Sequence, residues 1–406
     1  MSAMSTTGMD SGRLSAIDNF VKTNYLDSEK YPGFSLLVSR NGEIAHRSDQ
    51  GYADDAMFRI YSMSKPITSI ALMQLYEKGL FQLNDPVHRF IPAWEDLRVW
   101  IDGTPSNFHT TTPDRPMEVR DLLTHTSGLT YGWMQRTPVD AMYRRQGISS
   151  PKASLEDFCA GLADLPLMFS PGTQWAYSVA TDVIGRLVEI ISGQPFDEYL
   201  AENIFGPLGM TDTGFWAEGD KAERVAPLYT VPSLSPFGVP EGAEGDDMFM
   251  LDDSGSNSPV RTKPTFLSGG GGLLSTMHDY HRFCSALLRG GELDGNRIIG
   301  PRTLVYMTQN HLSTGSDLAS MGQPTFSESN YEGIGFGLGF SVVLDSSRAA
   351  VIGSPGAYAW GGAASTLFWI DPAEQLIVIG MTQLMPSSAY PIRDELKPMV
   401  YGAITD

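Results

Sequence analysis

Residues 58–80 read FRIYSMSKPITSIALMQLYEKGL, and this stretch decides the fold expected for the chain. It places Ser62 three residues before Lys65 and then continues as a segment that is apolar on nearly every face, which predicts a buried helix. Pro66 lacks an amide hydrogen and belongs in a first helical turn. We therefore expect a tight or 3₁₀-like turn at residues 62–64 and a regular helix from about Lys65. Ser62 then lies at the positive end of that helix, where N–H groups favour a developing negative charge.

The spacing of Ser62 and Lys65 suits nucleophilic catalysis. A serine hydroxyl is a weak nucleophile at neutral pH and needs a neighbouring base. Positions i and i+3 share one face of a helical turn, so the Lys65 ammonium can stand beside Ser62 Oγ. The tetrapeptide alone is weak evidence, because it also fits a helix-capping serine followed by a solvated lysine. Ser64 and Ser127 are other candidate nucleophiles, but neither has a lysine at i+3.

The composition is that of a globular protein and argues against several partners. The chain has 406 residues, 42% of them hydrophobic, and a net charge of −19. Phosphate and anionic lipid require concentrated Lys and Arg, so we expect neither a nucleic acid nor a membrane partner. Residues 1–20 lack the apolar core of a signal peptide, and no apolar run reaches a membrane span, which predicts a cytoplasmic protein. The two cysteines, Cys159 and Cys284, are expected as separate buried thiols.

Strand patterns near both chain ends enclose a mainly helical middle. An Asn-Gly pair predicts a β-hairpin over residues 33–47. Further strand patterns occur at residues 336–344, 364–370 and 376–383, and helical patterns at residues 13–24, 119–123, 155–163, 179–192, 196–204, 276–288 and 392–404. Residues 221–263 are rich in Pro, Gly and acidic residues and predict a long irregular loop. We expect an α+β protein with one antiparallel sheet domain from residues 1–85 and 268–406 and an inserted helical and loop domain at residues 86–267.

Two further segments complete a candidate site. Residues 171–178, PGTQWAYS, form a turn that delivers Tyr177 just ahead of a helical pattern. Residues 358–363, YAWGGA, lead into a strand pattern. Their small residues would let a ligand approach the backbone closely.

With these motifs in this order, the chain resembles the family VIII bacterial carboxylesterases, which are similar to class C β-lactamases and D-alanyl-D-alanine carboxypeptidases. The resemblance covers nearly the whole chain. It rests on SMSKP at residues 62–66, LLTHTSGL at 122–129, PGTQWAYS at 171–178, SGGGGLLS at 268–275 and WGG at 360–362. It implies a β-lactamase/transpeptidase-like fold, in which an antiparallel sheet is flanked by helices and carries a mainly helical insertion.

The resemblance also implies a role for each matched residue. Ser62 would be the acylated nucleophile, and Lys65 and Tyr177 would share its activation and the later proton transfers. The backbone amides of Ser62 and Ala363 would form the oxyanion hole. The residues that contact the substrate would be Trp360, Gly361 and Gly362. Lys65 and Tyr177 are both ordinarily protonated at neutral pH, so the sequence leaves open which of them is the general base.

Two departures from the lactamase pattern favour esters as substrates. The lactamase Tyr-x-Asn motif is Tyr177-Ser178-Val179 here, which lacks the amide that helps to bind a β-lactam side chain. Trp360 stands where lactamases carry a cation suited to a substrate carboxylate. We therefore hypothesise hydrolysis of short-chain esters through an acyl-enzyme on Ser62, with weak or absent β-lactam hydrolysis. The alternatives are a β-lactamase or D-amino-acid peptidase, an acyltransferase, and a non-catalytic penicillin-binding-like scaffold.

Other candidate sites are weaker. The chain has no Gly-x-Ser-x-Gly nucleophile elbow. Residues 269–272 are explained better by close backbone packing than by phosphate binding, because no Gly-Lys-Ser/Thr follows them. His278 and His281 have metal-ligand spacing without an evident third ligand, and His125 fits a structural role as well as a catalytic one. We expect a small-molecule ester substrate, no metal and no cofactor.

Overall fold

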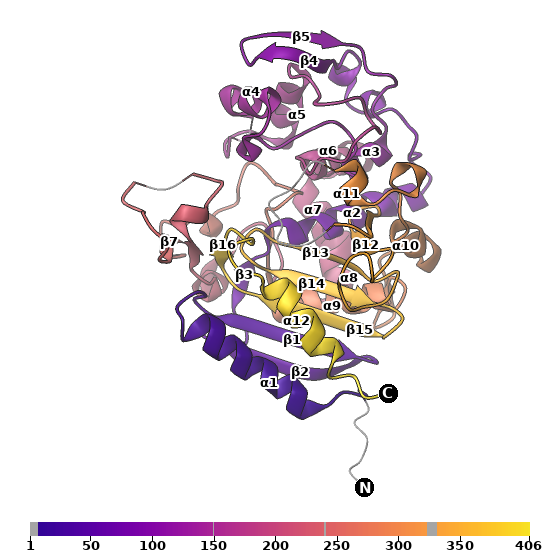
Figure 1. The fold of residues 1–406 in the computed structure, drawn as a ribbon. Coiled ribbons are helices and arrows are strands. Elements are labelled where there is room, and N and C mark those ends of the chain that lie inside the picture. The colour runs from indigo at the N-terminus through magenta and orange to yellow at the C-terminus, as the bar shows by residue number, and fades with distance from the viewer. Residues whose placement is uncertain (1–6, 149, 239–240, 323–330) are drawn as a thin grey trace.

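A seven-stranded antiparallel sheet forms the centre of the fold (Figure 1). The computed structural model describes residues 7–148, 150–238, 241–322 and 331–406. The strand order is β11-β12-β13-β14-β15-β1-β2, so strands from the two chain ends pair directly, as predicted. These strands are β1 (Phe34–Arg40), β2 (Glu43–Gln50), β11 (Ile334–Phe336), β12 (Ser341–Val343), β13 (Tyr358–Gly361), β14 (Leu367–Asp371) and β15 (Leu376–Met381).

The register of β1 on β15 shows how the sheet separates two hydrophobic cores. Leu37 lies opposite Ile379, and Val38 lies opposite Val378. Successive side chains of a strand point to opposite faces. Leu37 and Ile379 accordingly pack into the larger core, which extends into the helical part of the molecule, while Val38 and Val378 pack into the smaller one.

Two terminal helices cover the smaller core. Helices α1 (Ser11–Val21) and α12 (Ile392–Tyr401) lie on the same face of the sheet, as Figure 1 shows. The side chains that α1 and α12 bury against the sheet include Leu14, Ile17, Val21, Leu396 and Val400. The helical prediction for residues 13–24 is confirmed, and α1 continues into a π-helical turn at Lys22–Leu26.

Helix α2 (Ser64–Glu77) runs through the larger core and is buried along nearly its whole length, as its apolar pattern predicted. Helix α9 (Met277–Leu288) packs beside β14 and β15 on the same side of the sheet. The other helices are α3 (Val119–Leu123), α4 (Pro138–Gln146), α5 (Leu155–Ala163), α6 (Ala180–Ser192), α7 (Phe196–Leu200), α8 (Gly206–Leu208), α10 (Pro301–Met307) and α11 (Leu318–Met321). The domain boundaries drawn from the sequence stay a prediction.

Two local predictions were wrong. Residues 336–344 form no single strand, because a turn between β11 and β12 is closed by Gly337 N donating to Phe340 O at 2.8 Å. Residues 221–263 are not irregular throughout: β6 (Leu228–Thr230) pairs with β7 (Phe249–Asp252) and, in parallel, with β16 (Leu384–Met385). Residues 239–240 of that segment lie outside the described residues. A separate hairpin consists of β4 (Val99–Thr104) and β5 (Asn107–Thr111).

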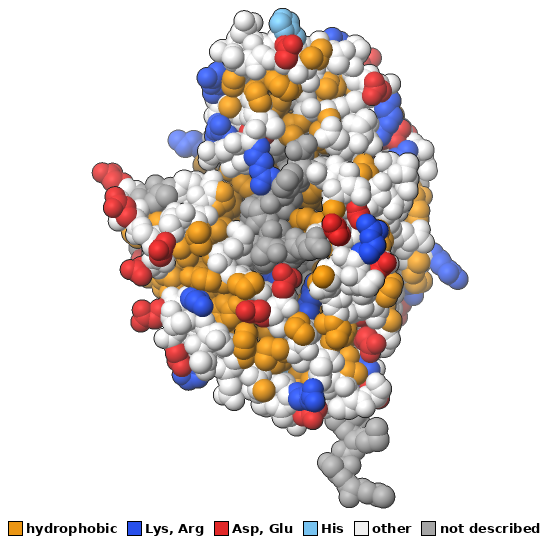
Figure 2. Space-filling view, viewed as in Figure 1, with side chains coloured by type: hydrophobic (Ala, Val, Ile, Leu, Met, Phe, Trp, Pro, Cys, Tyr) orange, Lys and Arg blue, Asp and Glu red, His pale blue; other side chains and the backbone are white. Residues whose placement is uncertain are grey.

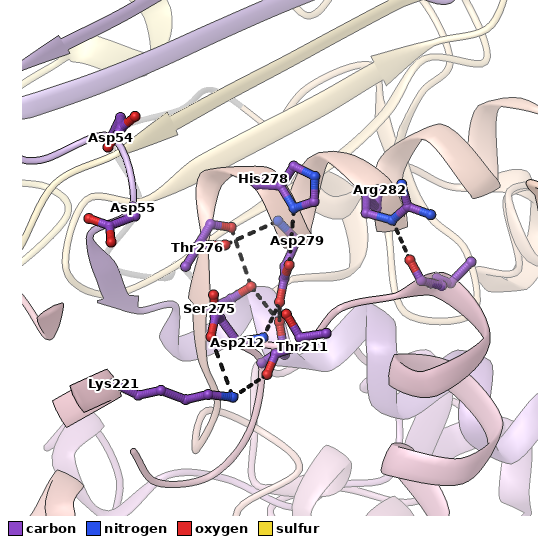
Figure 3. A network of polar contacts seen from close by, with 12 residues as sticks. Asp54, Asp55, Thr211, Asp212, Lys221, Ser275, Thr276, His278, Asp279 and Arg282 are labelled. Atoms are coloured by element: carbon purple, nitrogen blue, oxygen red, sulfur yellow. Dashed lines mark hydrogen bonds and ion pairs between the residues drawn. The ribbon is translucent and has the colours of Figure 1, made fainter. Parts of the chain in front are cut away.

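A polar network fixes the corner beneath the nucleophile segment (Figure 3). Strand β8 (Leu274–Thr276) leads into α9 and pairs with β3 (Met57–Arg59), the strand that precedes Ser62. The buried Asp279 carboxylate accepts hydrogen bonds from Asp212 N at 2.7 Å and from Thr213 Oγ1 at 3.0 Å. These two bonds tie the turn at residues 211–213 to the start of α9, and the Asp212 carboxylate also pairs with Lys221. A separate small hairpin follows α9, formed by β9 (Glu292–Leu293) and β10 (Asn296–Arg297).

The surface carries scattered charges. On the face drawn in Figure 2, Lys and Arg side chains do not form one continuous patch, and hydrophobic side chains gather in the left half, the side on which Figure 1 shows β7. Among the described residues, no helix combines the length and the apolar character needed to cross a bilayer. Cys159 and Cys284 are both free and buried, which confirms their prediction as separate thiols.

Candidate active site

Ser62 lies in a strained turn between a strand and a helix. A 3₁₀ turn spans Tyr61–Met63, and α2 follows directly, which confirms the turn and helix start predicted from the sequence. Tyr61 has a φ of +43°, a conformation that side chains other than glycine rarely adopt. The turn is held from behind by Ile60 N, which donates to Leu273 O at 3.1 Å. Strand pairing between β3 and β8 thus sets where the Ser62 side chain is presented.

The Ser62 hydroxyl receives two hydrogen bonds. Lys65 Nζ donates to Ser62 Oγ at 3.1 Å, and Tyr177 OH donates to it at 2.6 Å. Lys65 is 2% exposed, and its Nζ lies 4.6 Å from the centroid of the Tyr177 ring. The structure therefore brings together the candidate nucleophile and both candidate bases, although Ser62 and Tyr177 are 115 residues apart in the sequence. Such a geometry can take the proton from the serine as it attacks.

The glycine segment at residues 269–272 holds the Lys65 side chain. Lys65 Nζ donates to Gly270 O at 2.6 Å. The Asp182 carboxylate fixes this segment by accepting Gly270 N at 2.9 Å and Ser268 Oγ at 2.5 Å. A Cβ atom at Gly270 would stand 2.9 Å from Asp182 Oδ2, so close packing explains the glycine, as predicted.

Asp182 is a buried carboxylate close to the Lys65 cation. Burial raises the pKa of the Asp182 carboxyl, and the neighbouring Lys65 and the hydrogen bonds from Ser268 and Gly270 oppose that shift. None of the sequence motifs described above contains Asp182. Its position in the first turn of α6, one turn after Tyr177, is the signal that could have pointed to it.

A pocket opens at Ser62 and is lined mainly by aliphatic and aromatic side chains. Its lining includes Ser62, Tyr177, Tyr331, Ile334, Val351, Trp360, Gly361, Gly362, Ala363, Leu367, Trp369, Arg393 and Lys397. Trp360 Nε1 donates to Tyr177 OH at 3.4 Å, and the two rings lie 5.4 Å apart. Trp360 therefore forms a wall of the pocket directly beside the candidate base.

The turn after β13 presents the second expected oxyanion donor. Gly362 N donates to Thr366 O at 2.8 Å, which closes a tight turn around Ala363. Within the described chain no acceptor occupies the Ala363 amide, which lines the same pocket as Ser62. A Cβ atom at Gly362 would stand 2.4 Å from Ile60 O, so this turn presses against the residue two positions before Ser62.

The structure gives a different reason for Gly361 and Gly362 from the one predicted from the sequence. They were expected to leave room for a ligand, but protein atoms occupy the space where their side chains would be. A Cβ atom at Gly361 would stand 2.5 Å from Arg393 Nη2, and one at Gly362 would stand 2.1 Å from Thr366 Oγ1. Close packing against the Ile60 backbone requires glycine at residue 362, whereas the space beside Gly361 is filled by the end of the Arg393 side chain; the backbone of both glycines still lines the pocket.

His125 supports the site from behind. Its ring is buried, and its Nδ1 lies 3.2 Å from Ser178 Oγ. Ala176 N donates to His125 O at 2.9 Å. Burial, together with the nearby Lys65 cation, lowers the pKa of His125 well below its ordinary value, so the ring is neutral at physiological pH. These contacts fit the structural role weighed for His125, because they hold the segment that carries Tyr177.

The beta-lactamase family model matches residues 16–397 of the chain. The chain belongs to the beta-lactamase family. Protein Rv1367c of Mycobacterium tuberculosis is 33% identical over 373 residues, which cover 89% of this chain and 88% of that protein. Esterase EstB of Burkholderia gladioli is 30% identical over 424 residues, covering 97% of both. The solved structure of EstCE1, a hydrolase with promiscuous acyltransferase activity, has a TM-score of 0.77 at 24% identity and covers 98% of this chain and 99% of its own; this likeness shows the fold.

These findings identify a hydrolase of beta-lactamase fold with an esterase among its relatives. They also confirm the fold and the superfamily that the sequence motifs indicated. The roles of the individual site residues rest on the geometry above and stay proposals.

Both departures from the lactamase pattern have a different structural meaning from the one first given. Val179 is 3% exposed and packs into the larger core, so the side chain at this position contacts the interior. The absence of a cation at Trp360 does not leave the pocket without cations, because Arg393 and Lys397 of α12 line it. Sequence reasoning missed both, since α12 carries no motif that connects it with Ser62.

His278 and His281 do not face one another as ligands. His278 Nδ1 lies 3.3 Å from Asp279 Oδ1, and His281 Nε2 lies 3.3 Å from Ser285 Oγ. In the ranges that the structure describes, no three His, Cys, Asp or Glu side chains gather in a way that could hold a metal ion.

Proposed function

We propose that this protein hydrolyses short-chain carboxylic esters through an acyl-enzyme on Ser62. The observation that carries the proposal is the pair of hydrogen bonds that Lys65 Nζ and Tyr177 OH donate to Ser62 Oγ, at 3.1 Å and 2.6 Å. A serine hydroxyl that accepts these two hydrogen bonds at the opening of an apolar pocket is positioned for nucleophilic attack on a bound carbonyl.

In the acylation step, Ser62 Oγ forms a bond to the ester carbonyl carbon while its proton passes to Lys65 Nζ or to the Tyr177 oxygen, whichever of the two is unprotonated when the ester is bound. The carbonyl oxygen becomes an oxyanion and is bound by the amides of Ser62 and Ala363, donors that are each worth roughly 3 kcal/mol in related sites. Collapse of the intermediate breaks the bond to the alcohol oxygen, which takes up the proton. Water then attacks the acyl group by the same sequence in reverse, which releases the acid and restores Ser62.

The pocket walls support a small uncharged acyl group. Trp360 and Ile334 present apolar surface beside Ser62, which suits an uncharged acyl group, although Arg393 and Lys397 line the same pocket. The esterase relative at 30% identity supports ester hydrolysis over β-lactam hydrolysis. The cytoplasmic location and the absence of nucleic-acid and membrane partners stay predictions from the sequence.

The test compares p-nitrophenyl acetate, butyrate and octanoate with nitrocefin, using the wild type and Ser62→Ala. We expect fast hydrolysis of the short esters, slower turnover of octanoate and of nitrocefin, and loss of all of these in Ser62→Ala. Fast nitrocefin turnover with poor ester turnover would replace the proposal with a β-lactamase or D-amino-acid peptidase.

Two further rivals have their own tests. An acyltransferase would convert the acyl group to a new ester when a competing alcohol is added, which product analysis detects. A non-catalytic scaffold would form no covalent adduct at Ser62 with a serine-reactive phosphonate, which intact mass spectrometry detects.

A further inference from the structure

Arg393 donates two hydrogen bonds to the turn that contains Ala363, whose amide is the second expected oxyanion donor. It lies in the first turn of α12, and its Nη2 donates to Gly362 O at 2.9 Å and to Thr366 O at 3.0 Å. These two carbonyl groups are the ends of the turn around Ala363. One guanidinium therefore bridges both sides of the turn from the side occupied by α12.

The contact with Gly362 O reaches Ala363 through a single peptide unit. The C=O of Gly362 and the N–H of Ala363 belong to the same planar amide, and in a trans peptide they point in opposite directions. A carbonyl held by Arg393 on one side consequently aims the Ala363 N–H away from Arg393. A hydrogen bond from a charged donor also draws electron density from the amide, which makes its N–H a stronger donor.

The glycines of the turn fit this arrangement. Gly361 leaves the space in which the Arg393 guanidinium lies, because a Cβ atom there would stand 2.5 Å from Nη2. Gly362 lets the turn press against Ile60 O, two residues before Ser62. The two amides expected to bind the oxyanion, those of Ser62 and Ala363, are thus fixed relative to one another by the same contacts.

We propose that Arg393 is a positioning residue for catalysis, which orients and polarises the Gly362–Ala363 amide so that its N–H binds the oxyanion of the reacting ester. The proposal rests on the esterase function proposed above. Because the oxyanion exists only along the reaction path, removal of Arg393 lowers kcat and leaves KM nearly unchanged.

The first experiment measures Arg393→Met and Arg393→Lys against p-nitrophenyl acetate and the matching thionoester, in which sulfur replaces the carbonyl oxygen. Sulfur accepts hydrogen bonds weakly, so the wild type should strongly prefer the oxygen ester. Arg393→Met should lower kcat for the oxygen ester about 10- to 100-fold, a fraction of the loss seen when a donor is removed outright. It should lower kcat for the thionoester much less, and Arg393→Lys should recover part of the loss. Equal losses with both esters would overturn the proposal, because they would indicate general damage to the site.

A second variant is designed to displace the Arg393 side chain without substituting that residue. Gly361→Ala places a methyl group where Nη2 now lies, so it should displace the guanidinium and reproduce the ester-selective loss of Arg393→Met.

The matched control is Arg13→Met. Arg13 is an exposed arginine that donates to Gly402 O at 2.9 Å, at the other end of α12. Its loss should leave kcat and the preference for the oxygen ester unchanged, and a loss equal to that of Arg393→Met would overturn the proposal in favour of helix docking alone.

A substrate that carries a carboxylate separates positioning from direct substrate binding. If Arg393 bound substrate carboxylates, Arg393→Met would raise KM for the p-nitrophenyl monoester of succinate and spare the neutral acetate, which would overturn the proposal. Failure of the esterase function would be distinct, because Ser62→Ala would then retain the ester turnover of the wild type.

Discussion

At the scale of single residues, the site depends on how one hydroxyl is surrounded. Ser62 Oγ accepts from Lys65 and Tyr177, and Trp360 in turn donates to Tyr177 OH. These side chains form one connected set of hydrogen bonds, so removal of any member changes the geometry of the others. Their contributions to catalysis should therefore not be independent.

Ser62→Ala, Lys65→Met and Tyr177→Phe should each reduce kcat for p-nitrophenyl acetate by about 10³-fold or more, because each removes the nucleophile or a partner in proton transfer. The double variant Lys65→Met/Tyr177→Phe should be little worse than either single one. Steady-state kinetics after a check of folding by circular dichroism measures this. Near-normal turnover in Tyr177→Phe would remove the tyrosine from the proton path and leave Lys65 as the base.

Asp182→Asn should separate stability from activity. Burial raises the pKa of the Asp182 carboxyl in the folded protein. The protonated carboxyl therefore favours the folded state at low pH, and this contribution to stability is lost as the pH rises through the pKa of the folded protein. The buried charge therefore carries a cost at pH 7. Asparagine keeps an oxygen acceptor for Gly270 N without the charge, so the free energy of unfolding at pH 7 should rise.

The same substitution should lower ester turnover about 10-fold, since a negative charge near Lys65 is lost at a site arranged for proton transfer. Urea unfolding and p-nitrophenyl acetate kinetics measure the two effects. A variant that is both less stable and fully active would show that the carboxylate serves folding alone.

At the scale of elements, the packing of α9 makes the free energy of unfolding depend on pH. Burial, assisted by nearby cations such as Arg282 and Arg289, lowers the pKa of His281 to about 4. On acidification, the unfolded chain binds a proton at this ring from about pH 6.5, whereas the folded chain does so only near pH 4. The stability contributed by the neutral ring therefore falls between those two pH values.

His281→Gln should weaken this acid sensitivity. The decrease in unfolding free energy between pH 7 and pH 4.5 should be smaller in the variant by about 1–2 kcal/mol, less than the full shift implies because the ring is partly exposed. Thermal unfolding at the two pH values measures it. His109→Gln is the control, because that side chain is 78% exposed on the β4–β5 hairpin and should leave the difference unchanged.

Elements also show where sequence patterns were sufficient. The helices at Val119–Leu123 and Leu155–Ala163 lie where their periodicity placed them, and the Asn-Gly hairpin lies where its turn chemistry placed it. The strand predicted over residues 336–344 failed because apolar residues continue through a turn, and the apolar pattern cannot show that the chain reverses at Gly339 (φ +99°). Strand β6 was missed because its parallel partner, β16, is far away in sequence, and β7 was missed with it because β7 pairs with β6 alone.

At the scale of the whole molecule, the two ends of the fold are adjacent. Met9 and Ile404 form a bridge, and Thr405 N donates to Gly8 O at 3.0 Å. The first and last described parts of the chain are therefore held together by contacts outside the seven-stranded sheet.

A circular permutant should consequently fold and remain active. It would join Thr7 to Asp406 through a short Gly-Ser linker and begin at Ser106, an exposed position in the turn between β4 and β5. We expect ester turnover within about twofold of the wild type, because chain ends that are close in space and exposed loop tips tolerate such changes. The measurement is turnover per folded molecule. A permutant opened within β1 is the comparison and should fail to fold, since β1 lies between β15 and β2.

The sequence by itself determined the parts of this protein that depend on local chemistry and on ordered motifs. A serine with a lysine at i+3, a buried helix after it, and Tyr177 and Ala363 in matched segments were sufficient to predict the fold and to select residues that the structure brings together around one pocket. Local propensity and spacing act over a few residues, which is the range that a single sequence shows.

Only the tertiary structure decided which distant groups complete the site. Asp182 fixes the glycine segment that holds Lys65, and Arg393, from the last helix, grips the turn around Ala363. The space beside the two glycines after Trp360 is filled by protein atoms, which no local pattern distinguishes from room for a ligand. The physical reason is that charge and close packing act through space, between chain segments whose proximity is set by the completed sheet and not by their separation in sequence.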